Sequence, residues 1–438
     1  MLFRSGRSTC CFLHVVFWSS ACGLNFSQAP LFIMKTGPFG AFLRKARKWW
    51  TFKSIVVLIG CLYISTFSII MPLICRELGY SSFFASDRLQ EKVDLRNKER
   101  LEASLNFLGK YAKSNGVVGG LRKRKAGLKI CVAILSKSRS NSPGYLIQTF
   151  SKLVKETYNL TSYFNLNVIN AEFPPELNKD AVKLQSFDIG NYYIAHKDNQ
   201  RAYLEELDPY DKHRVDLIEA LSVCNSRAYH FALVLEDDAF AGENFGLVFD
   251  YLFQSFYKDV SLGYVKLYHP EKWQGFGYDT KLELSCVVVV TVTLVTTILL
   301  SIAGRANWSL RQIFQGLVLL LLISAYVLIF VYTFSRQHIL ETLKFSKFTH
   351  FIVNGPGCCT SAMLYPTRVL DELISFLRTG LVCSRNNPID IALANYFESN
   401  GKNRLLVVPN LFYHIGYYSS VSGAKDPREF FHLYPPKI

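Results

Sequence analysis

Three adjacent carboxylates, Glu236-Asp237-Asp238, are the residues of this chain whose type and spacing most clearly suggest chemistry. They follow the apolar run Phe231–Leu235, which is too short to cross a membrane and is typical of a buried central strand. Adjacent carboxylates beside a core repel one another unless a cation neutralises them, and their oxygens suit Mn²⁺ or Mg²⁺. A solvated acidic turn is the alternative. The apolar strand favours the metal, with Asp238 and Asp237 as the principal ligands and Glu236 assisting.

Charge and hydropathy set the class of protein. The chain has 438 residues and a formal charge of +15, and half of its residues are hydrophobic although 19% are charged. Membrane segments explain this combination. Much of the basic excess lies beside one apolar run, so we do not expect a nucleic-acid partner.

Three apolar runs have the length of a membrane span: Ile55–Ile74, Leu284–Ala303 and Ile313–Phe334. The basic segment before the first run is expected to stay in the cytosol, and so is the link 304–312, which carries two arginines and no acid. A pair of buried core helices is the alternative for the second and third runs. With three spans, both soluble parts of the chain lie in the lumen.

The first 33 residues are ambiguous. Thr9–Phe26 is apolar and follows two arginines, as in a signal peptide, while Met34 begins a second plausible amino terminus. A cleaved signal would place the basic segment before Ile55 in the lumen, so we expect a signal anchor at the first span instead. An upstream extension that never spans is the alternative for residues 1–33. The predicted organisation is a cytosolic segment 1–54 (1–33 doubtful), an anchor 55–75, a luminal stem 76–125, catalytic parts 126–283 and 335–438, and between them spans 284–303 and 313–334 joined by the cytosolic loop 304–312.

Strands and helices alternate in both soluble parts, which predicts an α/β fold with a largely parallel sheet. Ligands of such sheets bind where the strands end. A stem helix is expected over Leu89–Tyr111. The predicted strands are Lys129–Leu135, Phe164–Ile169, His230–Leu235, Phe348–Val353, Ala362–Tyr365 and Leu405–Val408, and the predicted helices are Pro143–Tyr158, Asp208–Ala228, Pro366–Leu377 and Asn387–Phe397.

These features together resemble a GT-A glycosyltransferase, whose acidic motif after a core strand holds Mn²⁺ on a nucleotide-sugar diphosphate. A closer resemblance is to the Golgi transferases that add an N-acetylgalactosamine side chain to glycosylphosphatidylinositol (GPI) anchors. It covers roughly residues 40–438 and rests on one amino-terminal span, the acidic triplet and a membrane hairpin inserted in the catalytic domain.

The resemblance implies a partner set and a location. The donor would be UDP-GalNAc, with Mn²⁺ or Mg²⁺ as cofactor and an inverting transfer. The acceptor would be a GPI-anchored protein or a GPI glycolipid. The protein would be a multi-pass Golgi membrane protein with its catalytic domain in the lumen. A non-catalytic membrane receptor or scaffold of the secretory pathway that retains the fold is the alternative.

The site residues that the resemblance implies lie at strand ends and turns. Asp390 is the candidate base for the acceptor hydroxyl, although an Asp near a helix start is also an ordinary cap. His414 is a candidate metal or phosphate ligand, or a structural histidine. The candidate nucleotide contacts are Ile134, Lys137, Arg139, Glu236, Asp237, Asp238, Pro356, Gly357 and His414; Lys137 equally suits a solvated loop, and the glycines around Pro356 equally suit a plain turn.

Five cysteines would be luminal, where disulfides persist: Cys131, Cys224, Cys358, Cys359 and Cys383. Their pairing cannot be read from spacing, and no zinc spacing is present. Asn159 is a predicted glycan acceptor, and Asn307 is expected to remain unmodified in the cytosol. We also hypothesise that the membrane hairpin serves a lipid-anchored acceptor.

Overall fold

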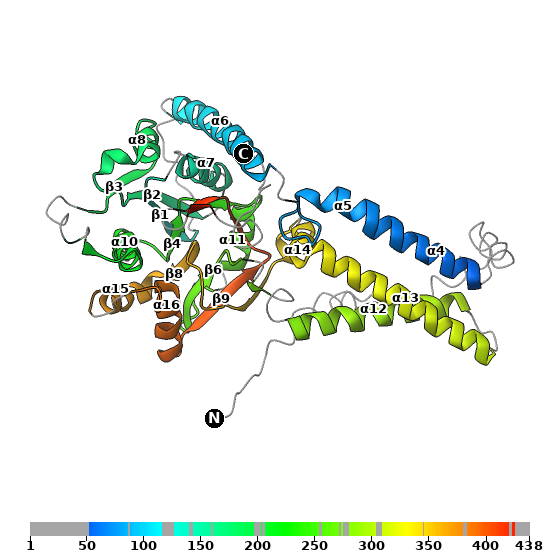
Figure 1. Ribbon diagram of the computed structural model, residues 1–438. Helices are drawn as coiled ribbons and strands as arrows, with labels where there is room; N and C mark the ends of the chain where they lie inside the picture. The colour runs from blue at the N-terminus through cyan, green and yellow to red at the C-terminus, as the bar shows by residue number, and fades with distance from the viewer. Residues whose placement is uncertain are drawn as a thin grey trace. The chain divides into compact units, whose positions relative to one another are not determined.

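The computed structural model divides the chain into two compact units (Figure 1). The helical unit comprises Met1–Ala85 and Trp273–Ile339, and the α/β unit comprises Ser86–Lys272 and Leu340–Ile438. The structure describes residues 52–85, 88–115, 127–139, 143–158, 160, 162–196, 203, 206–253, 256–270, 273–274, 280–303, 309–344, 346–379, 383–419 and 423–424. The predictions for residues 1–33, Asn159 and Asn307 fall outside these residues.

An eight-stranded sheet forms the centre of the α/β unit, in the order β3-β2-β1-β4-β8-β6-β9-β7. The four strands β3, β2, β1 and β4 are parallel, whereas β8 is antiparallel to both β4 and β6, and β7 is antiparallel to β9. The strands are β1 Lys129–Ser136, β2 Tyr163–Asn170, β3 Asn191–Ile194, β4 Phe231–Glu236, β6 Leu262–Lys266, β7 Phe351–Asn354, β8 Ala362–Pro366 and β9 Asn403–Val408.

Helices cover both faces of this sheet, which gives three layers (Figure 1). The alternation of side chains along β1 shows why. Ile130, Val132 and Ile134 enter one apolar core, and the intervening residues enter the other. The first core includes residues of α6 Leu89–Asn115, α7 Tyr145–Thr157, α8 Lys179–Gln185 and α11 Phe245–Phe253, and the second those of α10 Pro209–Cys224, α15 Leu370–Arg378 and α16 Ile389–Ser399.

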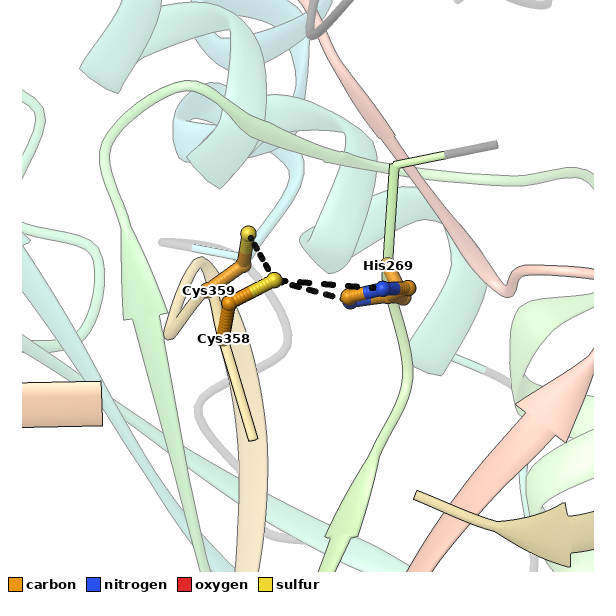
Figure 2. A group of neighbouring side chains, drawn as sticks. All are labelled: His269, Cys358 and Cys359. Atoms are coloured by element: carbon orange, nitrogen blue, oxygen red, sulfur yellow. Dashed lines mark hydrogen bonds between the residues drawn. The ribbon is translucent and has the colours of Figure 1, made fainter. Parts of the chain in front are cut away.

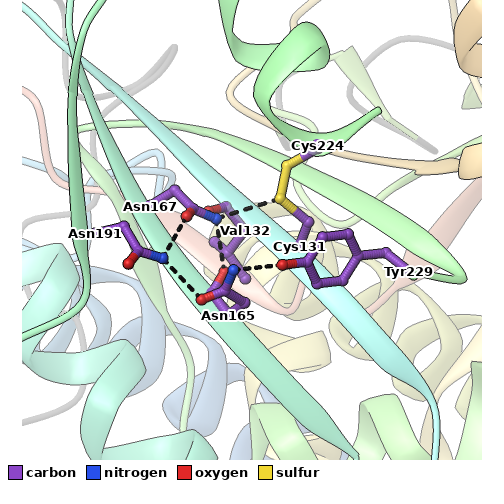
Figure 3. Close-up of a disulfide and its surroundings, with 7 residues drawn as sticks. All are labelled: Cys131, Val132, Asn165, Asn167, Asn191, Cys224 and Tyr229. Atoms are coloured by element: carbon purple, nitrogen blue, oxygen red, sulfur yellow. Dashed lines mark hydrogen bonds between the residues drawn. A yellow bond between two sulfur atoms is a disulfide. The ribbon is translucent and has the colours of Figure 1, made fainter. Parts of the chain in front are cut away.

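A disulfide joins the sheet to one of these helices (Figure 3). It links Cys131 of β1 to Cys224, the last residue of α10. Beside it, the buried Asn167 amide donates to the carbonyl of Val132 at 3.0 Å, so its polarity is satisfied inside the fold. The pairing of these two cysteines is the connectivity that spacing alone left open.

A small second sheet carries the carboxyl-terminal part of the α/β unit back to β4. Strand β5 (Ala239–Ala241) pairs antiparallel with β10 (Phe412–His414), and the register sets His414 opposite Ala239. Beyond it, β11 (Tyr418–Ser419) pairs with β12 (Gly423–Ala424). Residues more than 170 positions apart in sequence therefore meet directly after the acidic triplet.

Long apolar helices form the helical unit. Among the residues that the structure describes, two helices suit a membrane span by length and composition, Phe52–Glu77 and Leu310–Phe334, and these indicate a membrane protein. A shorter apolar stretch, Glu283–Ile298, lies in the helix at the second predicted span. The elements are α4 Phe52–Ser65, a π-helical turn Thr66–Ile70, α5 Met71–Ile74, a 3-10 turn Cys75–Glu77, α12 Thr280–Ala303, α13 Leu310–Phe334 and the first half of α14 Arg336–Leu343, since the helical unit ends at Ile339.

Polar side chains join the first and third of the predicted spans. The Tyr63 hydroxyl donates to the Leu322 carbonyl at 2.7 Å, and the hydroxyls of Thr66 and Tyr326 lie 2.8 Å apart. Hydrogen bonds of this kind hold apolar helices together where hydrophobic burial against one another contributes little. Helix α4 and the π-helical turn that follows it therefore contact α13 within the helical unit.

The α/β prediction is confirmed, with one qualification on strand direction. The predicted strands and helices all appear, with shifts of a few residues at their ends. Strands β8 and β7 run antiparallel to their neighbours, whereas the other six strands of the sheet run in one direction, since β6 and β9 also pair parallel. Strands β3, β6 and the β5–β10 pair were not predicted, since they are short and do not alternate clearly between apolar and polar residues.

Candidate functional site

The acidic triplet lies where the parallel strands end. Glu236 is the last residue of β4, and Asp237 and Asp238 follow it directly before β5. Because β1, β2 and β4 are parallel, their carboxyl ends meet at this same edge. Asp237 is 4% exposed and Asp238 is fully buried. Two buried carboxylates side by side require neutralisation.

Arg139 supplies part of that neutralisation. Its Nη2 contacts Oδ1 of Asp237 and lies 3.0 Å from Oδ2 of Asp238. Nη1 donates to the Tyr418 carbonyl at 2.7 Å, and the guanidinium lies 5.4 Å from the ring centroid of Tyr145. Burial raises the pKa of Asp237, and the guanidinium opposes that rise. Arg139 is thus a structural counter-ion of the triplet, at the position where a nucleotide contact was predicted.

A second set of ligand atoms remains for a metal. One atom each of Glu236, Asp238 and His414 lie within 4.8 Å of one another, with His414 Nε2 3.3 Å from Asp238 Oδ2. The ring of Tyr268 stacks on His414 with centroids 6.0 Å apart and so orients the imidazole. Two carboxylates and an imidazole form a donor set suited to Mn²⁺. The residues therefore fit a divalent ion.

Asp237 is placed differently from its two neighbours. It lies outside the group of three ligand atoms and pairs with Arg139, and its Oδ2 accepts from the Ser136 hydroxyl at 3.3 Å. Glu236 accepts from the Thr360 hydroxyl at 3.2 Å. The triplet thus combines side chains with separate partners, and the role of Asp237 as a metal ligand stays a prediction.

Gly416 is a site residue that sequence reasoning did not single out. A Cβ atom at this position would lie 1.9 Å from Oδ2 of Asp238, which is too short for two atoms that are not bonded. Any side chain here would therefore collide with the carboxylate. The next contact along the chain is a backbone hydrogen bond from Ile415 N–H to the Asp238 carbonyl at 3.0 Å. The only signal for this in the sequence is a glycine two residues after the candidate ligand His414.

Three further polar residues, Asn170, Asn178 and Asp180, lie at the same edge of the sheet. The Asn178 amide donates to the Ser136 hydroxyl at 3.0 Å and to Asn170 Oδ1 at 3.1 Å. Burial, and then the charge of Asp237, raise the pKa of Asp180 to about 6. Nothing in the local sequence distinguishes Asn178 or Asp180 from an ordinary helix start, because only the turn after β2 brings them to the edge.

Lys137 takes part in a separate buried cluster. Its Nζ lies 2.5 Å from Asp216 Oδ2, and His196 Nε2 lies 2.7 Å from Asp216 Oδ1. Although burial alone would raise the pKa of Asp216, the hydrogen bond from His196 and the charge of Lys137 hold it below its usual range. Lys137 is therefore fixed by an ion pair rather than left in a solvated loop.

The other predicted residues are spread more widely. Asp390 lies in the first turn of α16, where its Oδ2 accepts from the Cys359 N–H at 2.7 Å and its Oδ1 from the Ile391 N–H at 2.9 Å. Pro356 and Gly357 are half-buried in the loop between β7 and β8, and the Gly357 carbonyl accepts from Lys266 Nζ at 3.4 Å. The Ile134 side chain packs in the first apolar core.

Comparison with known families shows which family this α/β unit resembles. A family model described as GPI-N-acetylgalactosamine transferase PGAP4 matches residues 130–413, which is more than half of the chain. The match begins in β1 and ends in β10. It includes Arg139, the acidic triplet and Asp390, and stops one residue before His414.

Proposed function

We propose, from the premise that this chain belongs to the GPI-N-acetylgalactosamine transferase family, that it transfers N-acetylgalactosamine from UDP-GalNAc to the mannose core of GPI anchors. In this proposal the transfer is metal-dependent and inverting, and it takes place at the edge of the sheet where β4 ends. The observation that carries it is the convergence of Glu236, Asp238 and His414 on one point beside a half-buried Arg139.

Glu236, Asp238 and His414 would hold the metal. When bound, Mn²⁺ or Mg²⁺ acts there as a Lewis acid that neutralises the charge developing on the departing UDP. The chain's own contribution is to fix its charges in advance, since preorganised groups need not rearrange during the reaction. Arg139 holds the carboxylate of Asp238, and Gly416 leaves space for it.

Asp390 is proposed as the base that takes the proton of the acceptor hydroxyl. An inverting transfer needs a carboxylate in this role. Each of the two Asp390 oxygens accepts one backbone N–H, which fixes the carboxylate and leaves a second lone pair on each oxygen. The bond from the Ile391 N–H satisfies a donor in the first turn of α16, and an Asn side chain can still accept one of the two hydrogen bonds, so replacement by Asn tests the base while keeping part of these contacts.

The proposed topology has three spans, with the α/β unit in the Golgi lumen. The disulfide between Cys131 and Cys224 supports an oxidising compartment for this unit. Single Asn→Gln variants treated with an endoglycosidase test the orientation. A glycan is expected at Asn159 and none at Asn307; a glycan at Asn307 would invert the proposed hairpin.

The function itself is tested with the full chain purified in detergent. We expect transfer from UDP-GalNAc to a GPI-anchored acceptor in the presence of Mn²⁺, loss of transfer with a chelator, and weaker use of other UDP-sugars. Asp390→Asn should abolish transfer while donor binding persists, and Glu372→Gln, which changes an exposed carboxylate on α15, is the control. Transfer that is unaffected by the chelator would refute the metal, and no transfer from any nucleotide sugar would refute the enzyme.

A further inference from the structure

Two neighbouring free cysteines occupy the loop between β7 and β8 (Figure 2). The Sγ atoms of Cys358 and Cys359 lie 3.2 Å apart. A disulfide bond is about 2.0 Å long, so the two sulfur atoms are in contact and only about 1 Å from bonding distance. The third member of the cluster is His269, which is fully buried.

The orientation of His269 decides between two chemistries for this cluster. Two thiolates and an imidazole are ligands that zinc accepts, and a zinc ligand directs one ring nitrogen at the metal. Here Nδ1 and Nε2 of His269 lie at nearly the same distance from Cys358 Sγ, 4.0 and 3.9 Å. Neither nitrogen is therefore aimed at Cys358 Sγ in preference to the other, and with the two sulfur atoms 3.2 Å apart the arrangement favours sulfur–sulfur chemistry.

The α/β unit that holds the cysteine pair already contains a disulfide. Cys131 and Cys224 are bonded within this same unit, which indicates that the unit folds where thiols are oxidised (Figure 3). Cys358 and Cys359 are each half-buried, so they are accessible to the same oxidant.

The surroundings favour one sulfur atom as the attacking group. A hydrogen bond from Cys359, and then His269, lower the pKa of Cys358 to about 5, whereas the pKa of Cys359 is raised by its neighbour's sulfur and by burial. A thiolate beside a thiol is the pair that thiol–disulfide exchange requires. Lys266 lies beside them, with Nζ 2.7 Å from the Cys359 carbonyl.

We propose that Cys358 and Cys359 form a reversible disulfide that closes a small ring through their shared peptide bond and fixes the loop between Asp390 and Glu236. The Cys358 thiolate attacks a disulfide of the compartment, such as oxidised glutathione, and expels one thiolate. The Cys359 thiolate then attacks the mixed disulfide at Cys358 Sγ and expels the second. Two protein thiols are oxidised, one glutathione disulfide is reduced to two glutathione thiols, and the two protons leave with them.

A bond between adjacent residues is reversible for a geometric reason. Consecutive Cα atoms lie about 3.8 Å apart across a trans peptide, whereas disulfides usually join Cα atoms about 4.4–6.8 Å apart. The ring is therefore strained, and strained disulfides are the ones that cellular reductants open. The Cys131–Cys224 pair, with Cα atoms 5.4 Å apart, lies inside the usual range and should resist the same reductant.

The loop connects the two groups that the proposed reaction uses. The Cys359 N–H donates to Asp390, the next residue Thr360 donates to Glu236, and the carbonyls of Gly357, Cys358 and Cys359 all accept from Lys266. Ring closure removes rotational freedom at the centre of this loop. The effect on transfer rests on the proposed function, and it should make the oxidised protein the more active form, since small misplacements of catalytic groups are costly.

The disulfide is tested without any activity measurement. The full chain is equilibrated in glutathione buffers of graded reduction potential, alkylated and digested. The mass of the peptide that contains Cys358 and Cys359 is then measured by mass spectrometry. In oxidising buffer we expect this peptide to be unalkylated and lighter by two hydrogen atoms, and in moderately reducing buffer doubly alkylated while the Cys131–Cys224 peptides stay joined. Double alkylation at every potential that keeps Cys131–Cys224 intact would overturn the proposal, as would a zinc ion that is lost on replacing Cys358.

The effect on the reaction is measured in the same buffers. Oxidised wild type should transfer about tenfold faster than the moderately reduced protein. Cys358→Ser and Cys359→Ser should each show the lower rate at every potential, whereas Cys383→Ser, which changes a buried free cysteine elsewhere in the unit, should respond like wild type. Equal rates for wild type and both variants would refute the link to catalysis. If oxidised wild type transfers no sugar, the proposed function fails and the mass result stands independently.

Discussion

The two halves of the central sheet differ in how they are built and in what they bring to the site. The parallel half, β3-β2-β1-β4, comes from one continuous stretch of chain, Lys129–Glu236. The mixed half, β8-β6-β9-β7, is assembled from segments on both sides of the apolar helices α12 and α13. Charged side chains follow the parallel strands, namely Arg139 after β1 and the acidic triplet at the end of β4. The mixed half contributes the loop between β7 and β8, which donates hydrogen bonds to Glu236 and Asp390.

This difference teaches how the site divides its tasks. Strands that run the same way collect their following residues at one edge, so Arg139, Asp237 and Asp238 meet there as an ion network. The mixed half reaches this edge through the hydrogen bond from Thr360 to Glu236, and its neighbouring residue Cys359 bonds to Asp390. Changes to the charged residues that follow the parallel strands should therefore abolish transfer, and changes to the loop between β7 and β8 should weaken it.

The largest effect is expected for Asp238→Ala. This change removes a proposed metal ligand and leaves Arg139 and His414 without their shared carboxylate. We expect transfer to fall by at least about 100-fold, as for loss of other charge-stabilising groups. Transfer assays and Mn²⁺ binding on the purified chain check it. Full activity of Asp238→Ala would remove the central claim about the edge site.

Next in size is the stability effect of Arg139→Met. The substitution leaves Asp237 and Asp238 buried without their counter-ion, which typically costs about 3–5 kcal/mol of free energy of unfolding. Thermal unfolding in detergent should show a clear drop in midpoint, and Mn²⁺ should restore more of it in this variant than in wild type. A variant as stable as wild type would show that the carboxylates are neutralised by another group.

A smaller effect is expected for Gly416→Ala, in the segment that leads away from β10. The added methyl would collide with Asp238 Oδ2, so the carboxylate must shift from its position. We expect transfer to fall about tenfold with little change in unfolding midpoint. Gly109→Ala in α6, where no atom lies within 4 Å of the added carbon, is the matched control. Equal activity of both variants would show that the position of Asp238 is not critical.

The smallest effect concerns pH. The pKa of Asp180 is raised from 3.8 to about 6, so the folded protein binds this proton more tightly than the unfolded chain does. The contribution of this group to stability therefore falls as pH rises from about 4 to about 6. In metal-free buffer, Asp180→Asn should be more stable than wild type above pH 6 and equal to it near pH 4. An unchanged difference across this range would show that Asp180 titrates normally.

Much of the parallel half could be predicted because its signals are local. The apolar runs of β1, β2 and β4 and the amphipathic helix α7 show in short windows of sequence. The acidic triplet was identified because three adjacent carboxylates directly after such an apolar run are unusual. The contacts around the triplet were not predicted, since Arg139, Asn178 and Gly416 lie far from it in sequence and the residues next to them along the chain form no recognisable motif.

The sequence by itself determined which residues carry charge at strand ends, which stretches are apolar enough for a membrane, and that the fold is α/β. These follow from residue type and period, which are properties of neighbours along the chain. Only the tertiary structure decided that Arg139 neutralises Asp237 and Asp238, that His414 joins Glu236 and Asp238, and that Cys131 pairs with Cys224. The physical reason is that strand order and register set these contacts, and neither is encoded in any short window of sequence.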